Sequence, residues 1–284
     1  MEKIIGELAH PSRQPAGALT GSQPGRDAPS LLRQLELTSE LAKGGPTELW
    51  RTYLPQVFSL LRGIVTSPLE SSGAVGRTAV ALRDISIYHP KLVSQYLETL
   101  VPDMLRLAAT TLTVSQVATI ADGEDDGWGT DIPGVAEEVL ESLCGTQDPV
   151  QCFHLVLACL APGGRAGGGG LLSPQRHISS DQPIARGGGA VELPVGLLKT
   201  GVKSLGWLSR RMDAVTLFPL VQQAMPSINL AMGSTSAELR KATVFAVVDM
   251  WLVLGDSMGP ILSAHLTDSQ MRLVTIYVNK TARR

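Results

Sequence analysis

The sequence is poor in aromatic residues, cysteines and uninterrupted apolar runs. Aromatic side chains make up 4% of its 284 residues, which disfavours an aromatic-rich β-sandwich and suits helices built on Leu, Val and Ala. The three cysteines are an odd number without framework spacing, which argues against a disulfide-stapled secreted domain. No stretch approaches the ~18 apolar residues of a membrane span, and no signal-peptide pattern opens the chain. We therefore expect a reduced, soluble, cytoplasmic protein or fragment without a transmembrane segment.

Catalytic motifs are also missing from the sequence. It contains no G-x-S-x-G elbow and no H-E-x-x-H pair. The stretch 196–204 is close to a P-loop, but Val202 separates the second glycine from the lysine and no strand precedes it. The acidic residues of 122–131 lack the later Gly and Glu of a calcium loop. We therefore expect no enzyme activity and no cofactor.

Three cysteines and one histidine form a cluster of potential metal ligands in the sequence. Cys144, Cys152, His154 and Cys159 lie close together in the sequence. Zinc sites usually use C-x-x-C knuckles on turns, whereas these residues fall on two predicted helices. Because cysteine is among the most buried residue types, we interpret the cluster as helix core and expect no metal, with a zinc site as the alternative.

Apolar residues recur at helical spacing through most of the remaining chain. Asp148 is a predicted N-cap, as are Ser234 or Ser236 and Thr267 or Asp268. Internal prolines at 55, 102, 219 and 226 predict kinks or interruptions. The predicted helices lie near residues 47–64, 74–87, 90–108, 134–144, 149–160, 193–210, 214–231, 236–254 and 268–281.

These helices form pairs along the chain. Helices starting near 74, 134, 193 and 236 can each be the second member of an antiparallel pair, with an underlying unit near the ~40 residues of HEAT-type repeats. One such pair cannot bury its apolar face alone, so neighbouring pairs must stack. The predicted fold class is all-α, an α-solenoid of antiparallel helix pairs (HEAT/TOG-like).

Two segments rich in glycine or proline divide this array. Prolines and glycines of 11–29 lead us to interpret residues 1–46 as a largely flexible N-terminal segment. HEAT-like repeats follow over 47–162. Nine glycines mark 163–192 as a disordered insertion; a phosphate cradle is the alternative, but it needs a strand before it and a helix after it. Residues 193–284 are predicted to hold further HEAT-like repeats and a capping helix.

The predicted helix 236–254 has an unusual composition. From Val244 to Leu254 every residue is apolar except Asp249. A helix that is apolar all round is buried on both sides, so we predict the inner helix of the final repeat. Asp249 then needs a partner from a neighbouring helix or a backbone amide. A catalytic aspartate is the alternative, but no histidine or nucleophile is placed beside it.

The basic residues suggest a contact surface. Residues 193–284 hold ten lysines and arginines against five acidic residues, which favours an acidic partner such as the tubulin surface, nucleic acid or an acidic adaptor. The alternative is that these charges only solvate the outer helix faces. Three basic residues begin second helices, where turns line one edge of a solenoid, and others lie at the tail; these could instead pair with acidic side chains of adjacent repeats. The candidate partner-binding residues are Arg77, Arg240, Lys241, Lys280 and Arg283.

A family resemblance covers the last part of the chain. Residues 236–284 contain S-A-E-L-R-K-A-T-V-F-A-V-V-D-M-W-L-V-L-G-D, then P-I-L, then L-T-D-S-Q-M-R-L-V-T-I-Y-V-N-K. This stretch closely resembles the C-terminal domain of the cytoplasmic-linker-associated proteins (CLASP family), particularly the plant and green-algal kind. Residues 131–162, with Asp148-Pro149 and Cys152, are similar to its preceding repeats, and residues 31–90 are similar more weakly.

The resemblance implies a TOG-like α-solenoid with a binding function. Such a domain would recruit partners at microtubule plus ends, the cell cortex or kinetochores, and would help to regulate microtubule dynamics. In the family, tubulin contact is chiefly the work of other TOG domains. The expected partners are microtubules, contacted directly or through adaptors, and nucleic acid is not expected. The expected location is the microtubule cytoskeleton, spindle and cortex. A generic HEAT scaffold of a transport or regulatory complex is the alternative.

Overall fold

The computed structural model describes residues 28–66, 72–110, 131–161 and 193–283. These residues form helices and connecting turns, with no strand among them. The helices are α2 (Ala28–Gly44), α3 (Thr47–Thr66), α4 (Ser72–Tyr88), α5 (Pro90–Val93), η1 (Ser94–Tyr96), α6 (Leu97–Ala108), α8 (Ile132–Thr146), α9 (Pro149–Leu160), α10 (Val195–Ser209), α11 (Ala214–Met232), α12 (Ala237–Leu254), η2 (Gly255–Ser257), α13 (Met258–Ser263) and α14 (Asp268–Ala282).

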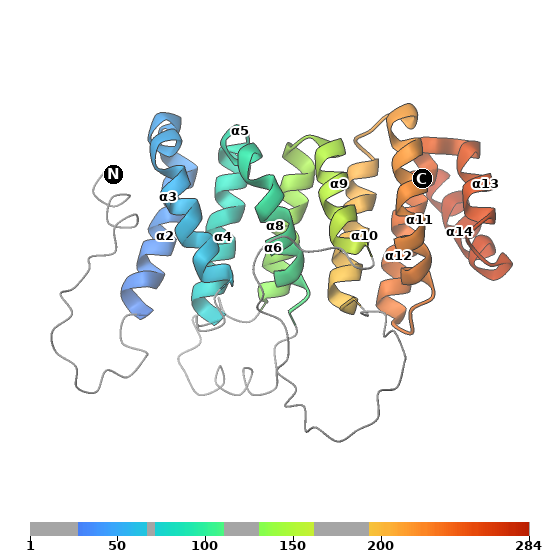
Figure 1. Ribbon diagram of the computed structural model, residues 1–284, viewed down its shortest axis with the longest axis horizontal. Coiled ribbons are helices and arrows are strands. Elements are labelled where there is room, and N and C mark those ends of the chain that lie inside the picture. The colour runs from blue at the N-terminus through green and yellow to red at the C-terminus, as the bar shows by residue number, and fades with distance from the viewer. Residues whose placement is uncertain (1–27, 67–71, 111–130, 162–192, 284) are drawn as a thin grey trace, which may run out of the picture.

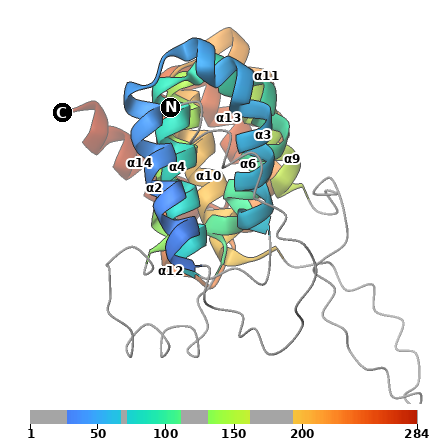
Figure 2. The same cartoon turned by 90° about the vertical axis from the view of Figure 1, so that its left-hand side faces the viewer.

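The helices stack in a row two layers deep (Figures 1 and 2). In one layer α4 lies between α2 and α8, α10 lies between α8 and α12, and α12 also contacts α14. In the other layer α6 contacts α3 and α9, and α9 contacts α11. Across the layers, α3 pairs with α4, α6 with α8, α9 with α10 and α11 with α12. The four predicted second helices are therefore α4, α8, α10 and α12, and the predicted α-solenoid is confirmed.

Side-chain caps fix where several helices begin. Asp148 accepts a hydrogen bond from the Gln151 amide at the start of α9, and Ser236 accepts one from Leu239 at the start of α12. Thr267 and Gln270 form a capping box at the start of α14. Each cap satisfies amides that an isolated helix end leaves without partners, and these three positions were predicted from the sequence.

The N-terminal prediction is wrong for residues 28–44. These residues form α2, which packs along α4 and buries Leu35, Thr38 and Ala42. Proline and glycine upstream suggested a flexible segment, but tertiary packing of one apolar stripe stabilises a helix of ordinary propensity. Residues 1–27 lie outside the described residues.

The predicted helix 90–108 is interrupted. The chain passes from α5 through the 3₁₀ turn η1 into α6, so the regular helix only begins at Leu97. The interruption does not lie at Pro102, which is inside α6, although proline lacks an amide proton and its ring crowds the carbonyl four residues earlier. Likewise, α3 continues through Pro55, and α11 continues through Pro219 and Pro226.

Helices that precede and follow the glycine-rich insertion pack into one continuous core. The helix α10 contacts both α8 and α9, which precede the insertion in the sequence. The insertion itself, predicted over 163–192, falls within the undescribed residues 162–192. The boundaries of the proposed domain division therefore stay predictions.

The apolar helix α12 is central to the C-terminal half. It contacts α10, α11 and α14, and Val247 and Met250 are fully buried. The prediction of burial on all sides is wrong at Phe245 and Leu252, which are exposed. The reason is that α14 leans away from the array (Figure 2) and covers only part of α12.

Asp249 has the partner that its burial demands. The Arg210 guanidinium, at the C-terminal end of α10, donates a hydrogen bond of 2.8 Å from Nη2 to Asp249 Oδ1. Burial raises the pKa of the Asp249 carboxyl, and the bond from Arg210 opposes that rise. The predicted partner from a neighbouring helix is confirmed.

One segment has the length and composition of a membrane span. Within Ala237–Ser263, an 18-residue stretch has a mean hydropathy of 1.5, and half of that stretch is buried inside the protein. A core helix of a folded array passes the same test, because burial among other helices and burial in lipid both select apolar residues. Here the contacts of α12 with α10 and α11 account for that composition.

Candidate partner-binding groove

The five predicted basic residues do not share one surface. Arg77 is buried in α4 and pairs with Glu36 of α2. The prediction that Arg77 lies at the exposed edge of the solenoid is therefore wrong, because α2 covers this side of α4. The structure shows the alternative, in which Arg77 pairs with an acidic side chain of an adjacent helix. Arg240, Lys241, Lys280 and Arg283 are all exposed.

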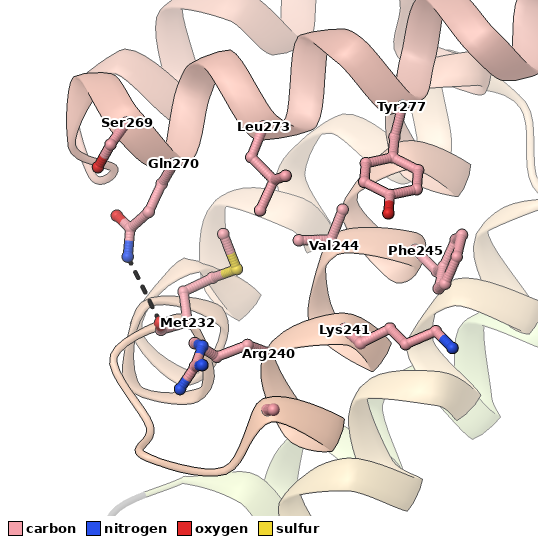
Figure 3. A pocket seen from close by; sticks show the side chains of 10 residues that line it. Met232, Arg240, Lys241, Val244, Phe245, Ser269, Gln270, Leu273 and Tyr277 are labelled. Atoms are coloured by element: carbon pink, nitrogen blue, oxygen red, sulfur yellow. Dashed lines mark hydrogen bonds between the residues drawn. The ribbon is translucent and has the colours of Figure 1, made fainter.

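Two of these residues line a groove between α12 and α14. The groove has a volume of about 560 Å³ and lies beside the turn that joins α11 to α12 (Figure 3). Arg240 and Lys241 come from α12, and α14 forms the opposite wall. The lining residues are Met232, Ala237, Arg240, Lys241, Val244, Phe245, Ser269, Gln270, Leu273 and Tyr277.

The floor and one end of the groove are apolar. Phe245 and Tyr277 meet edge to face, with ring centroids 5.5 Å apart and an interplanar angle of 76°. Phe245 is 43% exposed and Leu273 is 42% exposed, although both lie within an otherwise packed helix pair. A second helix or an extended segment could bury this surface, as apolar anchors do at protein interfaces.

Hydrogen bonds hold the other end of the groove in place. The Arg240 guanidinium donates from Nη1 to the carbonyl oxygens of Ser234 (2.7 Å) and Thr235 (2.9 Å). From the opposite wall, Gln270 Nε2 donates to the Met232 carbonyl at 3.4 Å (Figure 3). The Arg240 bonds therefore join α12 to the turn before it, and the Gln270 bond joins α14 to the end of α11.

The charges of α12 are divided between its two sides. Its acidic residues face α10, where Glu238 pairs with Lys199 at 3.4 Å and Asp249 pairs with Arg210 at 2.8 Å. Its basic residues, Arg240 and Lys241, face the groove, and within the part of the chain that the structure describes neither forms an ion pair. The groove therefore has a positive rim.

The remaining basic residues lie on α14. Lys280 follows Leu273 and Tyr277 at successive spacings of four and three residues, which places all three on one side of the helix. Arg283 is the C-cap residue of α14. The structure thus brings Arg240 and Lys241 together, adds Lys280 along the same side of α14, and leaves Arg77 and Arg283 apart from the groove.

Sequence reasoning missed the apolar part of the groove. Met271, Val274 and Val278 recur at helical spacing in the last helix, and Val274 is fully buried. Leu273 and Tyr277 form a second apolar pair, four residues apart, on an adjacent side. That pair was the available signal, since a helix with two apolar sides contacts more than one neighbour.

The cysteine cluster provides no comparable site. Burial raises the pKa of the Cys144 thiol to about 12 and that of Cys152 to about 11, as expected for cysteines packed in a helix core. Within the described ranges, no group of three or more His, Cys, Asp or Glu residues is placed to hold a metal ion. His154 instead lines a separate cavity of about 420 Å³ between α9 and α11.

The fold of this chain is found in known proteins, and its sequence is similar to that of several relatives. No family model matches the chain. Its fold is shared with the N-terminal domain of MAST/Orbit (TM-score 0.61, 11% identity, 100% of this chain and 98% of that one). It is also shared with a structure from work on microtubule plus-end tracking by XMAP215, CLIP-170 and EB1 (TM-score 0.58, 12% identity, 90% of each chain). At these identities the likeness shows the fold alone, a TOG-like helical array.

The sequence relatives are CLIP-associated proteins. The chain is 28% identical over 147 residues to the CLIP-associated protein of Arabidopsis thaliana, which is 51% of this chain and 8% of that protein. It is 26% identical over 111 residues to CLIP-associating protein 1-A of Xenopus laevis, which is 39% of this chain and 7% of that protein. The predicted resemblance to the CLASP family is confirmed. The matched part covers less than a tenth of the length of either relative.

Proposed function

We propose that this chain is a non-enzymatic module of a microtubule-associated protein. It would bind plus-end, cortical or kinetochore partners, and so help to regulate microtubule dynamics and organisation. The observation that carries the proposal is the sequence similarity to CLIP-associated proteins from a plant and a frog, over a chain that folds as a TOG-like array.

The architecture supports binding rather than chemistry as the mechanism. Stacked helix pairs give a stiff, extended surface whose parts keep fixed spacing. The groove between α12 and α14 contains basic, amide, hydroxyl and apolar side chains, but no carboxylate, histidine or cysteine to act as a base or nucleophile. Such a groove suits the recognition of another protein.

Direct contact with tubulin and contact through an adaptor are separate forms of this proposal. The positive rim of the groove favours an acidic partner in both cases. We also propose a location on cytoplasmic microtubules, the spindle and the cortex, as the names of the relatives suggest.

Purified chain and a fluorescent fusion test the proposed function together. In co-sedimentation, direct binding would bring the chain down with polymerised tubulin; in cells, binding through adaptors would place the fusion on microtubule ends, the cortex or kinetochores. A chain that does neither, although its far-ultraviolet circular dichroism shows folded helices, would contradict the proposal. Crosslinking to a vesicle-coat or phosphatase complex would support the generic HEAT scaffold instead.

A further inference from the structure

The groove between α12 and α14 has the dimensions of a short helix-binding site. Its α12 wall runs from Ala237 to Phe245, which is about 12 Å at the helical rise of 1.5 Å per residue. That length matches roughly two turns of a bound helix, which would present apolar side chains at spacings of three and four residues. The exposed surfaces of Phe245 and Leu273 offer the apolar contact for those anchors.

The charge of the groove selects the polar side of such a ligand. Arg240 is held by two backbone carbonyls, so its cation is fixed in position without being neutralised by a carboxylate. Lys241 is the adjacent residue on the same wall, and Lys280 extends the positive side along α14. The acidic residues of α12 are engaged by Lys199 and Arg210 and do not offset these charges at the groove.

We propose that this groove binds an acidic amphipathic helix of a partner protein. Two or three apolar side chains of the ligand would pack on Phe245, Leu273 and Tyr277, and flanking Glu or Asp carboxylates would pair with Lys241 and Arg240. This inference rests on the proposed function and names the chemistry of the partner. Burial of apolar side chains would supply most of the affinity for the ligand, and the charges would set its orientation and selectivity.

A designed peptide tests the chemistry without knowledge of the natural partner. The probe is a fluorescein-labelled helix of about 15 residues, with Leu at helical i, i+4 and i+7 positions and Glu beside them. Fluorescence anisotropy with the full chain should show saturable binding that weakens as salt is raised. One control peptide replaces each Leu by Ser and another replaces each Glu by Lys, and both should bind at least about tenfold more weakly.

Variants of the chain locate the binding site. Leu273→Gln should weaken binding of the acidic probe about tenfold or more, and Lys241→Glu should do the same. Lys241→Glu should also gain affinity for the Lys-bearing probe, which a merely misfolded chain would not. Arg272→Glu is the matched control, because Arg272 is an exposed cation of α14 outside the groove lining, and it should leave binding unchanged.

Several results would overturn the inference. If the Ser-substituted probe bound equally well, binding would be due to charge alone and not to apolar contact in the groove. If both groove variants bound the probe as well as wild type, the binding site would lie elsewhere. A concentration-dependent dimer in sedimentation velocity, abolished by Leu273→Gln, would show that a second copy of the chain occupies the groove. If the wild-type chain associates with microtubule partners and Lys241→Glu and Leu273→Gln do so equally well, this inference fails and the proposed function stands.

Discussion

Asp249 shows how a single carboxylate is accommodated within the most apolar run of the chain. It lies 8% exposed on α12, and its Oδ1 accepts the hydrogen bond from Arg210 of α10. An ion pair of this kind need not add net stability compared with an apolar pair of the same shape, but loss of one partner leaves a buried charge without compensation. We therefore expect the pair to favour the observed register between α10 and α12.

Substitution of Arg210 tests this account. Arg210→Met should lower the free energy of unfolding by about 1–3 kcal/mol at pH 7, because Asp249 loses its charged donor. Since burial already raises the pKa of Asp249, loss of the guanidinium should raise it further, so the excess destabilisation should shrink as pH falls toward about 4. Urea unfolding at several pH values measures this. In an Asp249→Asn background the same substitution should cost less; an equal cost would refute the pairing account.

His89 gives a second prediction at the residue scale. It is buried after α4, where Nε2 donates to the Ala42 carbonyl at 3.0 Å and the ring lies 5.4 Å from that of Trp50. Burial lowers the pKa of the imidazole, and the bond to Ala42 partly opposes this. Because the folded state favours neutral His89, its stability contribution is present above the unfolded pKa of about 6.5 and declines as pH falls below it.

The measurement is a comparison of unfolding midpoints at pH 7.5 and 5.5. Wild type should lose more stability over this interval than His89→Gln, whose amide can still donate to Ala42. Identical pH dependence of the two chains would show that His89 does not contribute. The other histidines are common to both chains and cancel in the difference.

At the scale of elements, the close approach of α10 and α12 depends on a glycine. A Cβ added at Gly206 would lie 3.0 Å from the Ala246 Cα and 3.1 Å from Asp249 Oδ2. The first of these atoms is backbone and cannot rotate away, so α10 and α12 would have to move apart by a few tenths of an ångström. The close approach of α10 and α12 at this point thus depends on the absence of a side chain at Gly206.

Gly206→Ala should therefore destabilise the chain by about 1–3 kcal/mol, although alanine is the better helix former. Gly145→Ala is the matched control, because it lies in α8 with no atom within 4 Å of its added Cβ. That control should be neutral or stabilising by up to about 1 kcal/mol. Thermal and urea unfolding of both variants distinguish packing from propensity, and a stabilised Gly206→Ala chain would contradict the packing account.

At the scale of the whole molecule, stability is distributed along a row of neighbours. Each helix contacts those beside it and across the layer, and α2 has no contact with α12 or α14 among the principal helix pairs. In such an array, stability is close to a sum of repeat and interface contributions, so damage at one end is felt mainly at that end. Groove binding at α12–α14 should accordingly be independent of the N-terminal helices.

A substitution in α2 tests this locality. Leu35 is fully buried between α2 and its neighbours, so Leu35→Ala should cost about 2–5 kcal/mol locally. Hydrogen exchange read by mass spectrometry should show lost protection in α2–α4 and little change in α10–α12. Glu40→Ala, an exposed change on the same helix, is the control. Equal loss of protection in all helices would show a single cooperative unit instead.

The sequence by itself determined the class of the fold and most of its helices. Apolar periodicity, the caps Asp148, Ser236 and Thr267, and the near-regular spacing of second helices all act within a few turns, so they can be interpreted locally. The same local composition predicted that Asp249 must have a partner. The resemblance to the CLASP family agrees with the similarity of the chain to CLIP-associated proteins of a plant and a frog.

Only the tertiary structure decided which faces are covered. Upstream proline and glycine suggested a flexible start, yet α2 packs on α4 and takes Arg77 out of solvent. The composition of α12 predicted burial all round, yet the lean of α14 leaves Phe245 exposed and opens a groove beside Lys241. Helix periodicity shows which residues share a face, but the angle and offset at which the next helix packs decide whether that face is core or a surface open to a partner.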